Sequence, residues 1–201
     1  MKKVLFLLTI ILVLTFSGCK QKPIIEKPVD EGPVFDRSVD LHTMKVTIDD
    51  REQYSIVGEI EYHANDNLDE LYLMMYPNTY SEETPRVSIN TLSIDNVDVS
   101  SSFEGEDDSA IHITLNTPIL NGDVVTIQYD MDVIYPDTFR LAHYSGSLYQ
   151  MYFYPFVAMY DGEFDIDPYS TRGETYYNVL NNYDVTISLD SGFIVSAAGE
   201  L

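Results

Sequence analysis

Hydrophobic and polar positions alternate with a period of two along most of the chain after Val39, a pattern that is typical of half-buried β-strands. The predicted strands are 41–48, 54–62, 70–76, 87–94, 110–115, 124–134 and 147–159. Residues 183–189 and 193–197 are expected to form a closing hairpin around Asp190-Ser191-Gly192. Many short strands at this spacing predict an all-β domain, mostly antiparallel, built as a β-sandwich or as curved sheets.

The first residues have the pattern of a targeting segment instead. Lys2 and Lys3 precede an unbroken apolar and threonine run at 4–16. A membrane-spanning helix needs about 20 apolar residues, so this run is too short to span comfortably. It has the length of a secretory signal core, and we expect a signal peptide at 1–18.

A lone cysteine follows this run. The segment Phe16-Ser17-Gly18-Cys19 resembles the lipobox of bacterial lipoproteins, in which the cysteine is lipidated and becomes the new N-terminus. The resemblance implies a lipid anchor on Cys19 and an extracytoplasmic protein held on a bacterial membrane. An ordinary signal peptide followed by a chance cysteine is the alternative.

Residues 19–36 are predicted to be a tether between the lipidated N-terminus and the domain. They contain three prolines and Gly32 among charges of both signs. Proline disfavours both helices and sheet ladders, so the segment is expected to be extended. This leaves 37–201 as a single domain.

Composition excludes some functions for that domain. The chain has 201 residues, with 33 acidic residues against 11 Lys and Arg and a formal net charge of −22. Such a surface is repelled by phosphate backbones, so nucleic acid is excluded as a partner. The single cysteine allows no internal disulfide.

Two acidic clusters are candidate metal sites. Glu59, Glu61 and His63 alternate on one face of a predicted strand, where two carboxylates and an imidazole could bind a divalent cation. The alternative is the solvent face of a half-buried strand, which we favour. The acidic stretch 161–168 could offer oxygen ligands to calcium, but its spacing does not match the twelve-residue calcium loop, and a solvated turn is favoured.

Other catalytic motifs are missing from the sequence. It has no His-Glu-x-x-His zinc helix, no Gly-rich phosphate loop and no Gly-x-Ser-x-Gly elbow. His112 alternates with isoleucines and should face solvent or a neighbouring strand, while His143 lies in a loop-like stretch. The aromatic stretch 149–156 could line a sugar or peptide groove, but a sheet core with a tyrosine-rich rim is favoured.

A set of short motifs in the second half occurs in a recognisable order. They are Phe153-Tyr154-Pro155, Met159-Tyr160-Asp161-Gly162, Asp167-Pro168-Tyr169, Asn182-Tyr183-Asp184-Val185-Thr186-Ile187 and Val195-Ser196-Ala197-Ala198-Gly199. Together with the strand-like segment 71–78, this order resembles the N-terminal domain of bacterial M1-family zinc metallopeptidases, the aminopeptidase N and leukotriene A4 hydrolase group. The resemblance covers roughly residues 40–200 and involves strands and turns, not a catalytic signature.

This resemblance implies a saddle-like β domain that packs against a zinc-dependent catalytic domain. In the family that second domain follows directly and supplies the zinc ligands and the general base. The present chain ends at Leu201, about where it would begin, so zinc and its ligands are expected outside this sequence, and this chain alone is not expected to hydrolyse peptides. A Gln or Glu near the aromatic segment holds the substrate's amine in the family, and Gln150 is the corresponding weak candidate here.

Three functions are therefore considered. The leading hypothesis is a lipid-tethered, non-catalytic N-terminal domain of an M1-type aminopeptidase, with the catalytic domain and peptides as partners. The second is a stand-alone surface lipoprotein that binds a peptide, a glycan or a protein. The third is an enzyme with a site hidden in the aromatic stretch, which no residue spacing favours.

Overall fold

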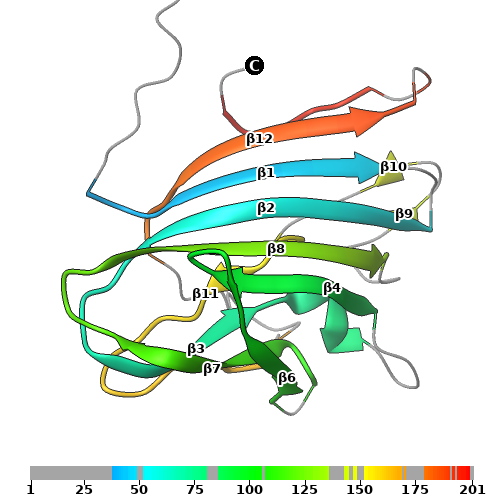
Figure 1. Ribbon diagram of the computed structural model, residues 1–201. Helices are drawn as coiled ribbons and strands as arrows, with labels where there is room; N and C mark the ends of the chain where they lie inside the picture. Colours follow the sequence, from blue (N-terminus) through cyan, green and yellow to red (C-terminus); the bar gives the residue numbers. More distant parts are fainter. Residues whose placement is uncertain are drawn as a thin grey trace, which may run out of the picture. The chain divides into compact units, whose positions relative to one another are not determined.

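The computed structural model describes parts of the chain that lie within the compact unit from Phe35 to Leu201. The described residues are 38–48, 52–80, 86–105, 107–135, 143–144, 147–148, 152–168, 170, 179–190, 192 and 194–199. They form a nearly all-β structure, as the alternation predicts (Figure 1).

The larger sheet has six strands in the order β12-β1-β2-β8-β4-β5. Its strands are β1 (Leu41–Ile48), β2 (Gln53–His63), β4 (Val87–Ile94), β5 (Val97–Asp98), β8 (Val124–Ile134) and β12 (Asn182–Leu189). Neighbouring strands are antiparallel except β1 and β12, which run parallel. The prediction of a mostly antiparallel domain is confirmed.

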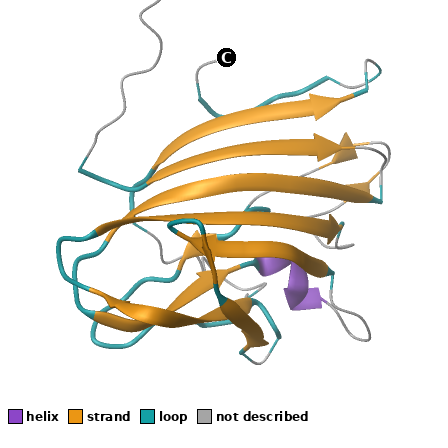
Figure 2. Cartoon of the chain, in the orientation of Figure 1, coloured by secondary structure: helices purple, strands orange, loops and turns teal. Residues whose placement is uncertain are grey.

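A smaller sheet has four antiparallel strands in the order β11-β3-β7-β6. They are β3 (Leu68–Met74), β6 (Ser100–Glu104), β7 (Ala110–Ile119) and β11 (Phe156–Val157). The two-residue strands β9 (His143–Tyr144) and β10 (Ser147–Leu148) pair with each other. A 3₁₀ helix, η1 (Tyr76–Tyr80), follows β3 and is the helical turn in Figure 2.

The two sheets share one hydrophobic core. Along β1, β2 and β8 most of the buried residues recur at every second position, so one face of the larger sheet is apolar and the other is mainly polar. The cluster includes Met44, Val46, Ile56, Ile60, Ile127 and Met131 from the larger sheet and Leu71, Leu73, Ile111 and Ile113 from the smaller one. Burial of each such side chain stabilises the fold by about 1.5–3 kcal/mol, which makes this cluster the main source of stability.

One row of residues crosses the larger sheet from edge to edge. The register places Val185, Met44, Gly58, Tyr129 and Leu92 opposite one another on successive strands. Gly58 is required here because a Cβ atom at this position would lie 2.6 Å from the Tyr129 Oη atom. The glycine therefore leaves room for the buried Tyr129 side chain.

The segment that contains β11 covers the other face of the smaller sheet. Phe156 and Ala158 pack with Met74, Tyr76 and Ala110 in a second hydrophobic cluster. The Tyr54 hydroxyl of β2 donates a hydrogen bond of 2.6 Å to the Phe153 carbonyl, which ties the segment to the larger sheet. The smaller sheet is thus covered on both faces near β11.

Two predicted strand ranges are wrong. The strand predicted at 110–115 extends to Ile119. Its register against β3 shifts between the pairs Glu70↔Thr114 and Leu68↔Ile119, and Pro118 lies in the resulting bulge. The strand predicted at 147–159 is reduced to β10 and β11 among the described residues. Tyr152 has a positive φ of 51°, and Pro155 has no N–H to donate, so regular pairing stops between them.

The predicted closing hairpin is also wrong. β12 forms as expected, but residues 194–197 are not in a strand, and β12 pairs in parallel with β1 instead. Because β12 is exposed along most of its length, a further strand beside it would have no core against which to pack. Ile194 is accordingly almost fully exposed.

Candidate functional site

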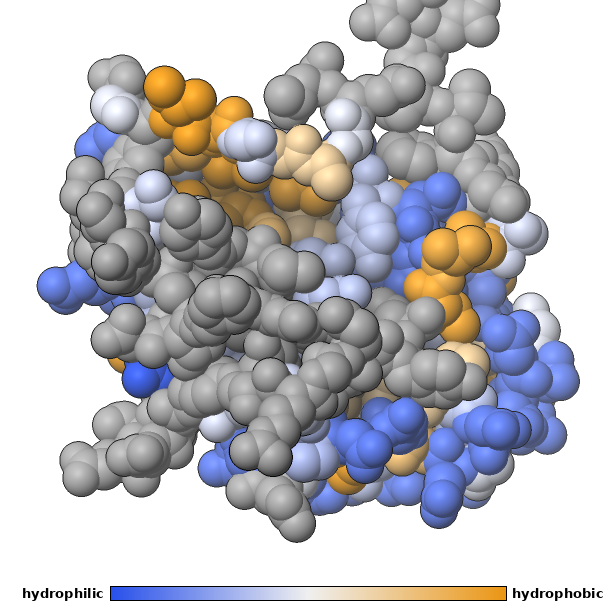
Figure 3. All heavy atoms as spheres, turned by 180° about the vertical axis from the view of Figure 1, so that it is seen from behind, coloured by the Kyte–Doolittle hydropathy of each residue, from blue (hydrophilic) through white to orange (hydrophobic). Residues whose placement is uncertain are grey.

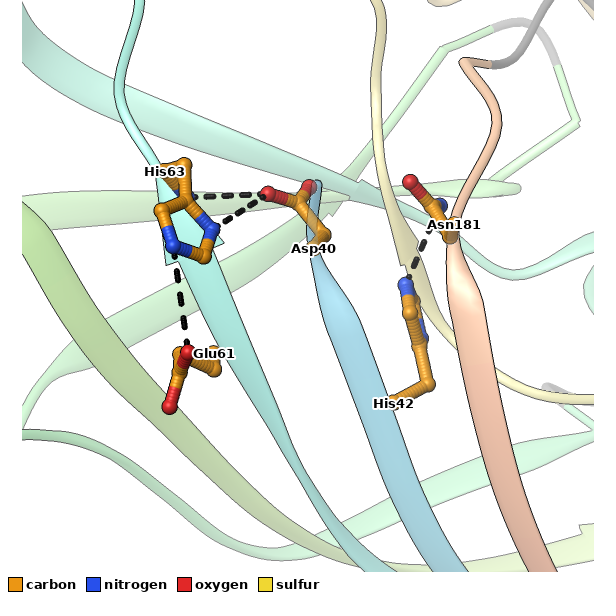
Figure 4. Close-up of polar contacts among 5 residues, drawn as sticks. All are labelled: Asp40, His42, Glu61, His63 and Asn181. Carbon is orange, nitrogen blue, oxygen red and sulfur yellow. Dashed lines mark hydrogen bonds and ion pairs between the residues drawn. The ribbon is translucent and has the colours of Figure 1, made fainter. Parts of the chain in front are cut away.

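A polar cluster forms where β1 and β12 begin and β2 ends (Figure 4). Asp40 precedes β1, and its Oδ1 atom accepts a hydrogen bond of 2.8 Å from the backbone N–H of His63. The Asp40 carbonyl accepts a second bond of 2.8 Å from the N–H of Asn182. One residue therefore fixes the ends of three strands relative to one another.

The electrostatics of this cluster are governed by burial. The Asp40 side chain is buried, and desolvation raises its pKa, an effect that the neighbouring His63 only partly offsets. The His63 Nδ1 atom lies 3.5 Å from Asp40 Oδ1, and the Nε2 atom lies 3.8 Å from Glu61 Oε1. The imidazole thus bridges a buried and an exposed carboxylate at the rim of the sheet.

His42 lies on the core-facing side of β1, the face that also carries Met44 and Val46. Its side chain is fully buried, and burial lowers its pKa to about 4, so the imidazole is neutral near pH 7. The Asn181 Nδ2 atom lies 3.2 Å from its Nε2 atom. If Nε2 accepts that contact, the proton is on Nδ1, which has no hydrogen-bond partner among the described residues.

Two tyrosines surround this histidine. The ring centroids of Tyr183 and Tyr154 lie 4.9 Å and 6.0 Å from that of His42. Burial, and then the Tyr183 hydroxyl, raise the pKa of Tyr154, so its hydroxyl stays protonated. The group has the features of a neutral, aromatic anchor for β12.

A third histidine lies on the outer face of the smaller sheet. His112 stacks on Tyr72 with centroids 4.8 Å apart. Its Nε2 and Nδ1 atoms each lie 3.0 Å from a carboxylate oxygen, of Glu70 and Glu104 respectively. The prediction that His112 faces solvent or a neighbouring strand is confirmed, because it is half-buried between strands β3 and β6.

The structure does not assemble the candidate cation site at 59–63, in line with the solvent-facing strand favoured from the sequence. Glu61 approaches His63, whereas the second carboxylate near the imidazole comes from Asp40 and not from Glu59. Glu59 is exposed on the polar face of β2, in register with Thr43 and Gln128. Within the described ranges, no group of three or more His, Cys, Asp or Glu side chains is placed to hold a metal ion.

The acidic stretch 161–168 forms a tight exposed turn. Tyr160 and Phe164 pair as an isolated bridge, and Gly162 takes a positive φ of 83° at the tip. Phe164 packs against the hydrophobic clusters, while Asp161 and Glu163 are exposed. This geometry is that of a solvated turn, the interpretation favoured from the sequence.

Several predicted features lie outside the described residues. They are the signal peptide at 1–18, Cys19 and the tether at 19–36, Gln150 and the side chain of His143. No helix among the described residues is long and apolar enough to cross a membrane.

Solved structures of M1 zinc metallopeptidases are similar in fold to part of this chain. One from Deinococcus radiodurans matches with a TM-score of 0.40 and 11% identity over 49% of this chain and 20% of its own. A two-domain M1 zinc metallopeptidase variant bound to L-tryptophan matches with a TM-score of 0.35 and 8% identity, over 52% and 23% of the two chains. The chain matches about a fifth of the length of these structures.

Sequence comparisons give no further relative. No protein-family model matches the chain, and no curated protein sequence matches it.

Sequence reasoning missed two long-range contacts that hold the ends of β1, β2 and β12 together. His42 and Asn181 are 139 positions apart, and Asp40 lies 23 positions from His63, so no local motif joins them. The alternation of residues along β1 contained part of the information, because His42 lies on the same face as Met44 and Val46. A histidine on the buried face of a strand predicts a neutral, packed side chain.

Proposed function

We propose that this chain is the membrane-tethered, non-catalytic N-terminal domain of an M1-type zinc aminopeptidase. In this proposal it supports peptide hydrolysis by a catalytic domain that lies outside the described residues. The ordered set of short motifs supports it, because the motif at 182–187 coincides with β12 and the motif at 159–162 coincides with a closed turn.

The observation that carries the proposal is the uncovered core-side face of β12. Tyr183, Val185 and Ile187 alternate on the face that continues the core, yet they are 38%, 40% and 36% exposed. Their partners on β1 in register, His42, Met44 and Val46, are all buried. β12 therefore has the composition of a core strand and the exposure of a surface strand.

Exposed apolar residues continue beyond this strand. Val179 and Leu180 precede β12 and Val195 follows it, and all three are exposed. Seen from behind, the molecule shows hydrophobic residues gathered in a hollow at the upper left, the side on which β12 and β1 end (Figure 3). Exposed apolar side chains gathered in this way are typical of an interface.

A catalytic domain is the proposed occupant of this face. Zinc, when bound in such a domain, activates a water molecule for attack on the peptide carbonyl. The ligands and the general base are expected in that domain, which would cover Tyr183, Val185 and Ile187. The present domain contributes a rigid support, and Gln150 remains a weak candidate for contact with the substrate's amine.

The proposed tether places this assembly outside the cytoplasm. Acyl chains on Cys19 would contribute about 0.8 kcal/mol of membrane affinity for each buried methylene. The strongly acidic domain is repelled by anionic lipid, so lipidation is needed to hold it at the surface.

The test uses the protein as it occurs in its native cells, captured with an antibody against this domain. We expect it to hydrolyse an aminoacyl-4-nitroanilide, to lose this activity with a chelator and to regain it with zinc, whereas the present chain alone stays inactive. A captured protein with the mass of this chain and no chelator-sensitive activity would contradict the proposal.

A further inference from the structure

The other edge of the larger sheet borders an open groove. β4 and β5 form a tight hairpin through Asp95 and Asn96, which both have positive φ. After Val99 the chain leaves the larger sheet and enters the smaller one as β6, so β4 and β6 diverge. The groove between them has a volume of about 590 Å³, which is within the range of binding sites for small ligands and peptides.

The groove is lined by both apolar and polar residues. Its lining residues are Val87, Ser88, Ile89, Asn90, Thr91, Leu92, Val99, Ser101 and Phe103. Val99, Ser101 and Phe103 occupy alternate positions, so one face of β6 is directed into the groove. Hydroxyl groups of Ser88, Thr91 and Ser101 lie among these lining residues beside apolar side chains.

The backbone of β4 is open toward the groove over a short stretch. The N–H of Val87 donates to Asn78 Oδ1 at 3.0 Å, and the carbonyl of Leu92 accepts from the N–H of Val99 at 3.2 Å. Between these two contacts, residues 88–91 have a strand partner among the described residues on one side only, β8. β6 likewise pairs with β7 alone.

The charge around the groove is predominantly negative. The amide of Asn90 donates to Asp130 Oδ1 at 3.1 Å and to Asp132 Oδ2 at 2.9 Å, which places two carboxylates beside a lining residue. Asp98 is adjacent in sequence to the lining residue Val99, whereas Glu104 contacts His112 on the outer face of the smaller sheet. Arg86, a cation adjacent in sequence to the lining residue Val87, donates a hydrogen bond to the Tyr135 carbonyl.

We infer that this groove binds an extended cationic peptide, which adds a strand to the open edge of β4. Strand addition satisfies backbone groups of the open edge, and pockets for alternate side chains provide selectivity. Lys or Arg side chains of the peptide would approach the carboxylates of Asp130 and Asp132. The site is on the opposite edge from β12 and does not depend on the peptidase proposal.

The size of the open stretch limits the length that can be bound. Four residues, 88–91, span about 13 Å in a strand, so a peptide of about six residues covers them with one residue to spare at each end. The bulge at Asn90, where the register against β8 shifts, lies within this segment.

The test measures fluorescence anisotropy of a labelled hexapeptide, Lys-Thr-Lys-Val-Lys-Thr, with the full chain. Two control peptides are used: one has glutamate in place of lysine, and one is N-methylated at alternate amides so that it cannot pair with a strand edge. Ser101→Lys adds bulk and positive charge inside the groove. Ser102→Lys makes the same change on the next, equally exposed residue of β6, which is outside the groove lining.

We expect the cationic peptide to bind and Ser101→Lys to weaken binding at least about tenfold, with less than about a twofold effect for Ser102→Lys. Added salt should also weaken binding. No binding of the cationic peptide, equal binding of the glutamate or N-methylated peptide, or equal effects of the two lysine variants would overturn the inference. Circular dichroism of both variants shows whether the fold is retained.

Discussion

The two edges of the larger sheet expose different groups. At the β12 edge, apolar side chains on the core-facing side are half exposed, while at the β4 edge the core-facing Val87 and Leu92 are buried. β4 instead leaves its backbone open beside hydroxyl and amide groups. The two proposals accordingly assign different partners: a large apolar surface to β12 and a short extended peptide to β4.

The difference also shows how each edge is held in place. β12 is attached to the sheet through buried polar groups, Asp40 and His42, at its first residues. β4 is attached through apolar contacts and the Asn78 side chain, which accepts hydrogen bonds from the backbone of Arg86 and Val87. The stability of the β12 edge is therefore expected to depend on pH more strongly than that of the β4 edge.

The largest expected effect is the loss of stability on acidification caused by His42. Its folded-state pKa of about 4 is below the ordinary value of 6.5, so the unfolded state binds the proton more tightly. The stabilising contribution is fully present above pH 6.5 and is lost as the pH falls toward 4, by up to about 3 kcal/mol.

Urea unfolding between pH 7 and 4 measures this effect. His42→Gln should flatten the dependence, and His63→Gln, which retains His42, should keep it. The same slope in His42→Gln as in the unchanged chain would show that burial of this imidazole does not govern the β12 edge.

The second prediction compares two substitutions, one at each end of the row of residues that crosses the larger sheet. Leu92→Ala removes a buried side chain at the β4 edge and should lower the free energy of unfolding by about 2–3 kcal/mol. Val185→Ala, at the β12 edge of the same row, should cost less than about 1 kcal/mol in this chain because Val185 is already 40% exposed. Equal losses in urea unfolding would mean that Val185 is covered in this chain.

The smallest effect concerns the outer face of the β4 edge. Asn90→Ala removes the amide that bridges Asp130 and Asp132 and should destabilise the chain by about 0.5–1 kcal/mol at low salt. The loss should shrink in concentrated salt, because repulsion between the two exposed carboxylates is screened. A loss that is independent of salt would exclude this electrostatic explanation.

The sequence predicted the central strands because their burial is one-sided. Residues 41–48, 54–62 and 124–134 alternate between core and solvent, and all three strands form where the pattern places them. The alternation failed at Pro118, Tyr152 and Pro155, where a bulge, a positive φ and a missing N–H override side-chain preference.

The candidate sites were less predictable because each depends on distant pairings. The parallel pairing of β1 with β12 brings His42 to Asn181, and no turn signal encodes that pairing. The groove arises because β4 and β6 diverge at Val99. The sequence of this stretch predicts successive strands but gives no sign that they belong to two sheets. The alternation along β1 was a signal that could have identified His42 as buried.

The most direct test of the central claim is hydroxyl-radical footprinting of β12. Tyr183, Val185 and Ile187 should be labelled in the chain alone and protected in the protein captured from its native cells, because a catalytic domain would cover them. Val57, exposed on the outer face of β2, provides the reference and should be labelled in both. Equal labelling of β12 in the two samples would contradict the account.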